Sequence, residues 1–132
     1  MCHRVYIILR LCGLKVGELH SKLPQCARLS NLSLFAKGEQ RVLLATDLAA
    51  RGLDIQGVET VINFKLNASY EMYVHRVGRT ARAGKKGLAV SLVAEDEYRN
   101  LKLFKKQSKT PMYKRIVDRG EICLTLIRVF FF

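Results

Sequence analysis

Two stretches decide how this sequence is interpreted: residues 45–55, ATDLAARGLDI, and residues 75–84, HRVGRTARAG. The second stretch spaces Arg76, Arg79 and Arg82 three residues apart. On a helix, such steps put side chains along neighbouring positions of one side. A guanidinium is permanently charged, planar and able to bond two phosphate oxygens at once. The row therefore predicts binding to a polyphosphate or a nucleic-acid backbone, and the alternative is a solvated basic helix face.

Helical and strand patterns alternate around these stretches. We expect helices over residues 3–12, 24–36, 70–76 and 95–106, and strands over residues 15–19, 41–45, 58–64 and 87–93. In the second helix, Leu29, Leu32 and Ala36 line the expected buried face, with Phe35 beside them. Residues 41–45 are apolar without alternation, as expected of a strand that is covered on both faces.

This alternation predicts an α/β fold, with a mostly parallel sheet, helices on both faces and right-handed crossovers. Ligands bind such sheets at the carboxyl ends of the strands. Residues 45–55 follow a predicted strand directly, and residues 75–84 lie one element beyond another. Both stretches can therefore face the same rim of the sheet.

Composition narrows the classes of partner. The 132 residues are enough for one domain, and the net charge of +12 favours a polyanion, most commonly a nucleic acid. An anionic membrane surface ranks lower because the basic residues are not gathered on one amphipathic helix. The last apolar run is too short to span a bilayer.

Cysteines at 2, 12, 26 and 123 form no Cys-x-x-Cys pair and have no histidine pair at zinc spacing, so we expect reduced thiols and no metal.

Phosphate-binding motifs are missing from the sequence. It has no Gly-x-x-x-x-Gly-Lys-Ser/Thr loop, no Gly-x-Gly-x-x-Gly turn and no acidic cluster for magnesium. A chain that has phosphate-binding arginines but no loop to cradle the phosphates supplies only half of a phosphate site. The other half would come from another domain, and the arginines would neutralise charge on a transferred phosphoryl group.

Three stretches of the sequence resemble motifs of DEAD-box RNA helicases. Residues 45–55 resemble motif V, residues 73–82 resemble motif VI, and Gln25-x-x-Arg28 is similar to motif IVa. The resemblance runs over residues 3–106 and implies the second RecA-like domain of such an enzyme. The amino-acid sequences of residues 16–20 and 79–84 most resemble those of the nucleolar subgroup involved in ribosome assembly.

The resemblance also implies roles for individual residues. Arg79 and Arg82 would reach the γ-phosphate of ATP, and Asp54 would bind its ribose. His75 and Arg76 would couple the site to the acidic motif of the first domain. The residues implied to bind the RNA backbone are Gln25, Arg28, Thr46, Asp47, Arg51 and Gly52.

Some positions depart from the family pattern. The first strand should precede the helix at His3, so we expect the sheet to lack one strand and the domain, residues 1–106, to be incomplete at its N-terminal edge. Ser21 replaces a common glycine and would strain the turn if that glycine needs positive φ. Asn67 stands where proline is common. Residues 107–132 are expected to be a basic extension with an atypical apolar tail.

The resulting hypothesis is the C-terminal half of an ATP-dependent RNA helicase. It would act as a monomer whose partners are RNA and the first RecA-like domain. Its cofactor would be ATP with Mg, held mainly by that absent domain. Because the Walker loop and the DEAD box are absent, the chain alone should be inactive. The location would be the nucleus or nucleolus, otherwise the cytoplasm, and the chain would be neither secreted nor bound to a membrane. The alternatives are a non-enzymatic basic fragment that binds RNA or sequesters partners, and a chain that does not fold stably.

Overall fold

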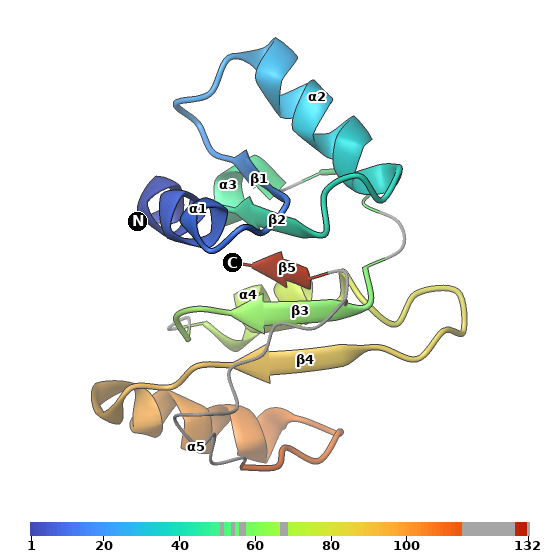
Figure 1. The fold of residues 1–132 in the computed structure, drawn as a ribbon. Coiled ribbons are helices and arrows are strands. Elements are labelled where there is room, and N and C mark those ends of the chain that lie inside the picture. The colour runs from blue at the N-terminus through green and yellow to red at the C-terminus, as the bar shows by residue number, and fades with distance from the viewer. Residues whose placement is uncertain (51, 54, 56–57, 67–68, 115–128, 132) are drawn as a thin grey trace.

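A parallel five-stranded sheet forms the centre of the molecule. The computed structural model describes residues 1–50, 52–53, 55, 58–66, 69–114 and 129–131. The strands are β1 (Val16–Leu19), β2 (Val42–Ala45), β3 (Thr60–Asn63), β4 (Leu88–Ser91) and β5 (Val129–Phe131). Their order across the sheet is β1-β2-β5-β3-β4, and every neighbouring pair is parallel (Figure 1). The predicted α/β fold with a mostly parallel sheet is therefore confirmed.

Helices connect most of these strands, close to where the sequence predicts them. The helices are α1 (Cys2–Leu11), α2 (Gln25–Ala36), α3 (Asp47–Ala50), α4 (Tyr70–Val77), the 3-10 turn η1 (Glu95–Glu97) and α5 (Tyr98–Gln107). Gly13 adopts φ of +80° just after α1, and Ser69 caps α4 by accepting a hydrogen bond from the Met72 amide at 3.5 Å. None of the helices among the described residues has the length and apolar character needed to cross a membrane.

Strand β2 lies between two apolar clusters, as its unbroken apolar run predicts. Leu43 and Ala45 belong to the larger cluster, which also contains Phe35 of α2 and Ala49 and Ala50 of α3. Val42 and Leu44 belong to the other cluster, against which α1 packs. Since side chains alternate along a strand, α1 covers one face of β2, and α2 and α3 cover the other. All four residues of β2 are buried.

The buried face of α2 differs from the prediction. Phe35 is fully buried and Leu32 packs against the larger cluster, but Leu29 is 57% exposed and Ala36 is also exposed. The predicted stripe is wrong because Phe35 is the side chain that points at the sheet, and a helix presents only neighbours three or four positions away on the same side. Leu32 meets that condition, whereas Leu29 and Ala36 do not.

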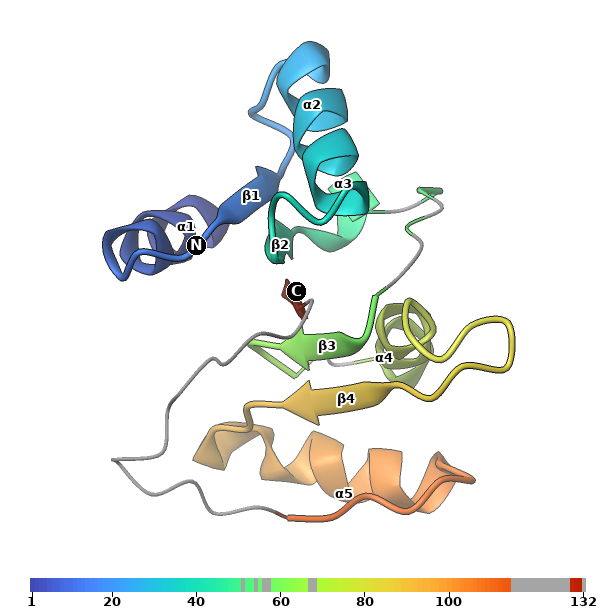
Figure 2. The ribbon, with the colours of Figure 1, turned by 45° about the vertical axis from the view of Figure 1, so that its right-hand side comes forward.

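The position between β2 and β3 is occupied by β5. Phe130 pairs with Leu43 on one side and with Val61 on the other. Figure 2 shows β5 in this central position, with β1 and β2 on one side and β3 and β4 on the other. The sheet was expected to lack a strand, and residues from the expected apolar tail hold a central place in it. Asn67 lies outside the described residues.

The turn after β1 is free of the strain considered for Ser21. Among the described residues other than glycine, Ala81 and Ala83 are those with positive φ, at 56° and 54°. Ser21 therefore has an ordinary backbone conformation. The Leu23 amide donates to the His20 carbonyl at 3.1 Å and closes this turn just before α2.

Candidate phosphate-binding site

Thr46 and Asp47 stand where β2 ends, at the rim predicted to bind ligands. The Thr46 amide donates to the Leu19 carbonyl at 3.0 Å, which ties this point to the end of β1. The Thr46 carbonyl accepts from the Ala50 amide at 3.0 Å in the first turn of α3. Thr46 and Asp47 are both half-buried. The backbone is therefore fixed here, while both side chains keep access to solvent.

Arg76 of α4 joins the two motif stretches. Its Nε and one terminal nitrogen donate to the two carboxylate oxygens of Asp47, both at 2.6 Å. Its Nη1 donates to the Lys65 carbonyl at 3.0 Å and to Oδ1 of Asn63 at 3.4 Å. Arg76 is only 8% exposed. A bidentate pair of this kind fixes orientation as well as distance, so residues 45–55 and 75–84 are held in one arrangement.

Asn63 extends this network to the next strand. The side chain is 1% exposed at the end of β3, and its amide nitrogen donates to the Ser91 hydroxyl of β4 at 3.1 Å. That bond leaves Oδ1 of Asn63 directed at the Arg76 guanidinium. The buried network therefore crosses from α3 through α4 to β3 and β4. Sequence reasoning missed Asn63 and Ser91, because a single amide or hydroxyl at a strand end has no distinctive spacing.

Arg79 and Arg82 do not continue the helix of Arg76. Helix α4 ends at Val77, with Gly78 as its C-cap, so the predicted row of three arginines on one helix side is wrong. The chain turns instead through Ala81, Ala83 and Gly84, all with positive φ, and positive φ is incompatible with a right-handed helix.

The turn nevertheless holds both arginines to the protein. Arg79 is half-buried, and its Nη1 donates to the Leu53 carbonyl at 2.6 Å. Arg82 is exposed, and its Nε donates to the Gly78 carbonyl at 2.7 Å. The first bond is a second link between the two motif stretches. Arg82 is the most exposed of the three arginines.

Thr80 anchors the turn that carries these arginines. The residue is 5% exposed, and its hydroxyl lies 2.7 Å from the Val58 carbonyl and 3.0 Å from the Glu59 carbonyl, just before β3. Gly87 approaches it so closely that an added Cβ would lie 2.2 Å from the Thr80 hydroxyl oxygen. A side chain at position 87 would therefore displace the anchor. The sequence singled out the arginines around Thr80 but not Thr80 itself.

The motif IVa pair lies beside the same rim. Nη1 of Arg28 donates to the Gln25 side chain at 3.1 Å, and Nη2 donates to the Ala49 carbonyl of α3 at 3.4 Å. Arg28 is half-buried and Gln25 is exposed in the first turn of α2. The structure thus brings Arg28 to residues 45–55.

The other predicted site residues are less constrained. His75 is exposed on α4. Gly52 has φ of +75° and open space around its Cα, so glycine is required there for its conformation rather than for a tight contact. Arg51 and Asp54 lie outside the described residues, and their roles stay predictions.

An aromatic cluster positions the helix that carries Arg76. The ring of Phe104 on α5 lies 5.5 Å from that of Tyr70 and 5.4 Å from that of Tyr73, both on α4. Burial, and then the neighbouring Tyr70, raise the pKa of Tyr73 above its ordinary value. Tyr73 therefore stays protonated at neutral pH and acts as a packing residue.

The described part of this network can bind anions. Its carboxylate, Asp47, is bonded to Arg76, and the cations Arg28, Arg79 and Arg82 are bonded to carbonyls of residues 49, 53 and 78. Such a set suits phosphate groups, which guanidinium donors bind through oxygen pairs.

The matches to known proteins include both motif stretches, residues 45–55 and 75–84. The model of the helicase conserved C-terminal domain matches residues 1–84. The chain is 48% identical over 133 residues to the ATP-dependent RNA helicase DRS1 of Mycosarcoma maydis, covering 98% of this chain and 14% of that protein. It is 50% identical over 127 residues to DEAD-box ATP-dependent RNA helicase 28 of Oryza sativa subsp. japonica, covering 95% of this chain and 16% of that protein.

Solved structures agree with these matches. The DEAD-box protein SrmB of E. coli, bound to the regulator of ribonuclease activity A, superposes with a TM-score of 0.82 at 37% identity, covering 88% of this chain and 68% of that one. Domain 2 of the DEAD-box helicase Mss116p, bound to an RNA duplex, superposes with a TM-score of 0.66 at 28% identity, covering 90% of this chain and 41% of that one. The chain spans only 14% and 16% of the length of the two curated relatives.

Proposed function

Because this chain belongs to the DEAD-box RNA helicases and carries their helicase conserved C-terminal domain, we propose that it acts as one half of an ATP-dependent RNA helicase. In this proposal the chain binds the RNA backbone through residues at the ends of β1 and β2. It presents Arg79 and Arg82 to ATP that is held mainly by another domain. Asp54 binds the ribose, and His75 and Arg76 couple the site to that domain.

The bidentate bond between Asp47 and Arg76 is the observation that carries this proposal. Thr46 and Asp47 belong to the stretch proposed to bind RNA, and Arg76 belongs to the stretch proposed to meet the phosphates of ATP. The two 2.6 Å bonds make one rigid unit of both stretches. A displacement of one stretch by RNA would therefore move the other, which is the coupling that an ATP-driven RNA enzyme requires.

The residues of this chain fit part of an ATP site. Arg82 lies in a turn whose residues 81–87 are exposed, and the half-buried Arg79 lies just before it, so a nucleotide on another domain could approach them. ATP with its Mg would supply the phosphoryl group and the charge that neutralises it. The sequence has no Walker loop, so this chain supplies the arginines and leaves the phosphate cradle to the other domain.

RNA-stimulated ATP hydrolysis tests the proposal. The purified chain alone should show no turnover, and a first RecA-like domain of a close relative added in trans should restore some. Arg79→Ala or Arg82→Ala should then lower the rate on the order of a thousandfold, as loss of an arginine finger does. The matched control is Arg99→Ala, an exposed arginine on α5, which should leave the rate unchanged. Robust turnover by the chain alone would refute the half-site.

A non-enzymatic RNA-binding or partner-sequestering role is the second candidate, and the net charge of +12 favours it. Binding of this kind weakens steeply as salt rises and needs no sequence match. ATP separates the two functions. With the first domain present, the helicase half should hold single-stranded RNA more tightly when an ATP analogue is added, whereas a basic fragment should bind equally with and without it.

We also propose a nuclear, and specifically nucleolar, location. This proposal is supported by the sequences of residues 16–20 and 79–84, which resemble those of the nucleolar subgroup of the family. Imaging of the tagged chain tests this, and a purely cytoplasmic signal would contradict it.

A further inference from the structure

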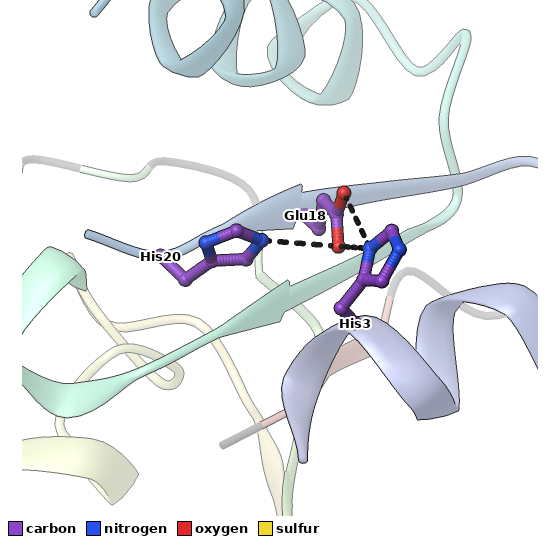
Figure 3. A group of neighbouring side chains, drawn as sticks. All are labelled: His3, Glu18 and His20. Carbon is purple, nitrogen blue, oxygen red and sulfur yellow. Dashed lines mark hydrogen bonds and ion pairs between the residues drawn. The ribbon is translucent and has the colours of Figure 1, made fainter. Parts of the chain in front are cut away.

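Two imidazoles and a carboxylate converge at a place that the proposed function does not use. His3 lies on α1, Glu18 on β1, and His20 directly after β1 (Figure 3). Nδ1 of His3 is 3.0 Å from Oε2 and 3.2 Å from Oε1 of Glu18, and Nε2 of His20 is 3.4 Å from the same Oε2. The three ligand atoms all lie within 4.8 Å of one another. We propose that they bind a divalent transition-metal ion of the Zn²⁺ class.

Burial makes Glu18 costly without a positive charge beside it. Its side chain is 8% exposed, in a strand whose four residues are all buried. An ionised carboxylate in such a place requires a cation or several hydrogen bonds. Nε2 of His20 is also buried, and among the described residues it has no hydrogen-bond partner, although Oε2 of Glu18 is close. A bound cation would satisfy both groups at once.

The ligand types and their spacing select the class of ion. Zinc takes imidazole nitrogen and carboxylate oxygen at about 2.0–2.2 Å, usually with tetrahedral geometry. Ligand atoms of one tetrahedral ion then lie roughly 3.3–3.5 Å apart, which follows from those bond lengths. The two nitrogen-to-Oε2 distances of 3.0 and 3.4 Å are close to this spacing. His3 is 61% exposed at its side chain, so water can complete the coordination from that side.

Binding requires the imidazole protons to move. The Lys22 amide donates to Nδ1 of His20 at 3.2 Å, so without an ion the ring proton belongs on Nε2. Coordination through Nε2 moves that proton to Nδ1 of the same ring and ends the bond with Lys22, which lies in an exposed turn. In His3, coordination through Nδ1 likewise moves the proton that it donates to Glu18 onto Nε2. Ion binding should therefore switch both rings to the other tautomer and loosen the turn at residues 20–23.

The location predicts a structural role for the ion. His3 belongs to α1, which packs on the smaller apolar cluster, and Glu18 and His20 belong to β1 and its end. An ion held by all three would clamp α1 to the sheet. The same end of β1 is bonded to Thr46 and leads through residues 20–24 to Gln25. The clamp would thus steady one border of the proposed RNA-binding rim.

Titration of the metal-free chain with Zn²⁺ tests the site. One equivalent should bind and raise the thermal midpoint. Glu18→Gln and His20→Gln should each weaken the affinity on the order of a hundredfold or more, because the loss of even an outer-shell partner costs 10- to 100-fold. The matched control is His75→Gln, which removes the third and last histidine of the chain and should bind zinc as the unaltered protein does.

Two further measurements keep the result independent of how the variants fold. In the unaltered chain, Zn²⁺ should shift the ring signals of His3 and His20 and the amide signal of Lys22, but not the ring signals of His75. With Co²⁺, the absorption spectrum should lack the intense near-ultraviolet bands of thiolate ligation. Zinc affinity unchanged by Glu18→Gln, ring signals that stay in place, or thiolate bands would overturn the proposal and leave a hydrogen-bonded cluster only.

Discussion

At the scale of single residues, the surroundings of Cys2 shift the acidity of its thiol. It is half-buried beside the smaller apolar cluster, whereas Cys12 and Cys26 are exposed. Burial, and then the negative charge of Glu18, raise the pKa of the Cys2 thiol above its ordinary value of 9.0. Because the thiolate is the reactive form, a raised pKa lowers reactivity at a given pH.

Alkylation by iodoacetamide at pH 8 should therefore modify Cys2 several-fold more slowly than Cys12 or Cys26. The rate at Cys2 should rise to its plateau at a higher pH than that of a free cysteine. Peptide mapping by mass spectrometry at timed intervals measures each site separately. Glu18→Gln should speed the reaction at Cys2 and leave Cys12 unchanged, and equal rates at all three thiols in the unaltered chain would contradict the interpretation.

The Asp47–Arg76 pair is the second residue-scale feature, and its contribution to stability can be measured. Asp47→Asn keeps the shape of the side chain but removes the charge that faces a guanidinium with 8% exposure. Hydrogen bonds to charged groups contribute roughly 1.5–3 kcal/mol. We expect a loss of that size in the free energy of unfolding, measured by urea denaturation.

The control for this variant is Glu39→Gln, which removes an acid that is exposed just after α2. Such surface changes alter stability by about 0.5 kcal/mol or less. Equal effects of Asp47→Asn and Glu39→Gln would show that the buried guanidinium does not depend on Asp47.

At the scale of elements, local signals predicted most helices and strands. The glycine after α1, the proline before α2 and the unbroken apolar run of β2 act within a few residues of the structure they specify. The helix predicted over residues 70–76 matches α4, but placing all three arginines on one helix side was wrong. The spacing of Arg76, Arg79 and Arg82 suits a helix, but Gly78 and the positive φ of Ala81, Ala83 and Gly84 end it. Periodicity cannot show where alanine will take a left-handed conformation.

Long-range contacts were beyond sequence reasoning at both candidate sites. The motif residues were predicted, yet the pairing of Asp47 with Arg76 joins different elements, and its supports Asn63 and Ser91 carry no motif. The cluster of His3, Glu18 and His20 was not predicted either. His3 and Glu18 come from a helix and a strand that only the fold brings together, so no zinc-like spacing exists to be found. Chemistry-bearing residues are recognisable in sequence when they share one element or one known motif.

At the scale of the whole molecule, β5 joins the two parts of the sheet. Strands β1 and β2 lie on one side of it and β3 and β4 on the other, and β5 pairs in parallel with both β2 and β3. The polar links between Asp47 and Arg76 and between Leu53 and Arg79 cross the same division. Stability of the sheet and alignment of the candidate site should therefore depend together on β5.

Phe130→Pro tests this dependence by removing a backbone donor from the middle of β5. Position 130 pairs with Leu43 on one side and Val61 on the other, and a central strand uses its N–H groups in ladder bonds that proline cannot make. We expect the free energy of unfolding to fall by roughly 2–4 kcal/mol, a large part of the 5–15 kcal/mol typical of a domain. The control is Lys114→Pro, at an exposed position outside any helix or strand, which should change stability by less than about 1 kcal/mol. Chemical denaturation followed by circular dichroism measures both variants. If Phe130→Pro unfolds at the same denaturant concentration as the Lys114→Pro control, β5 does not hold the two parts of the sheet together.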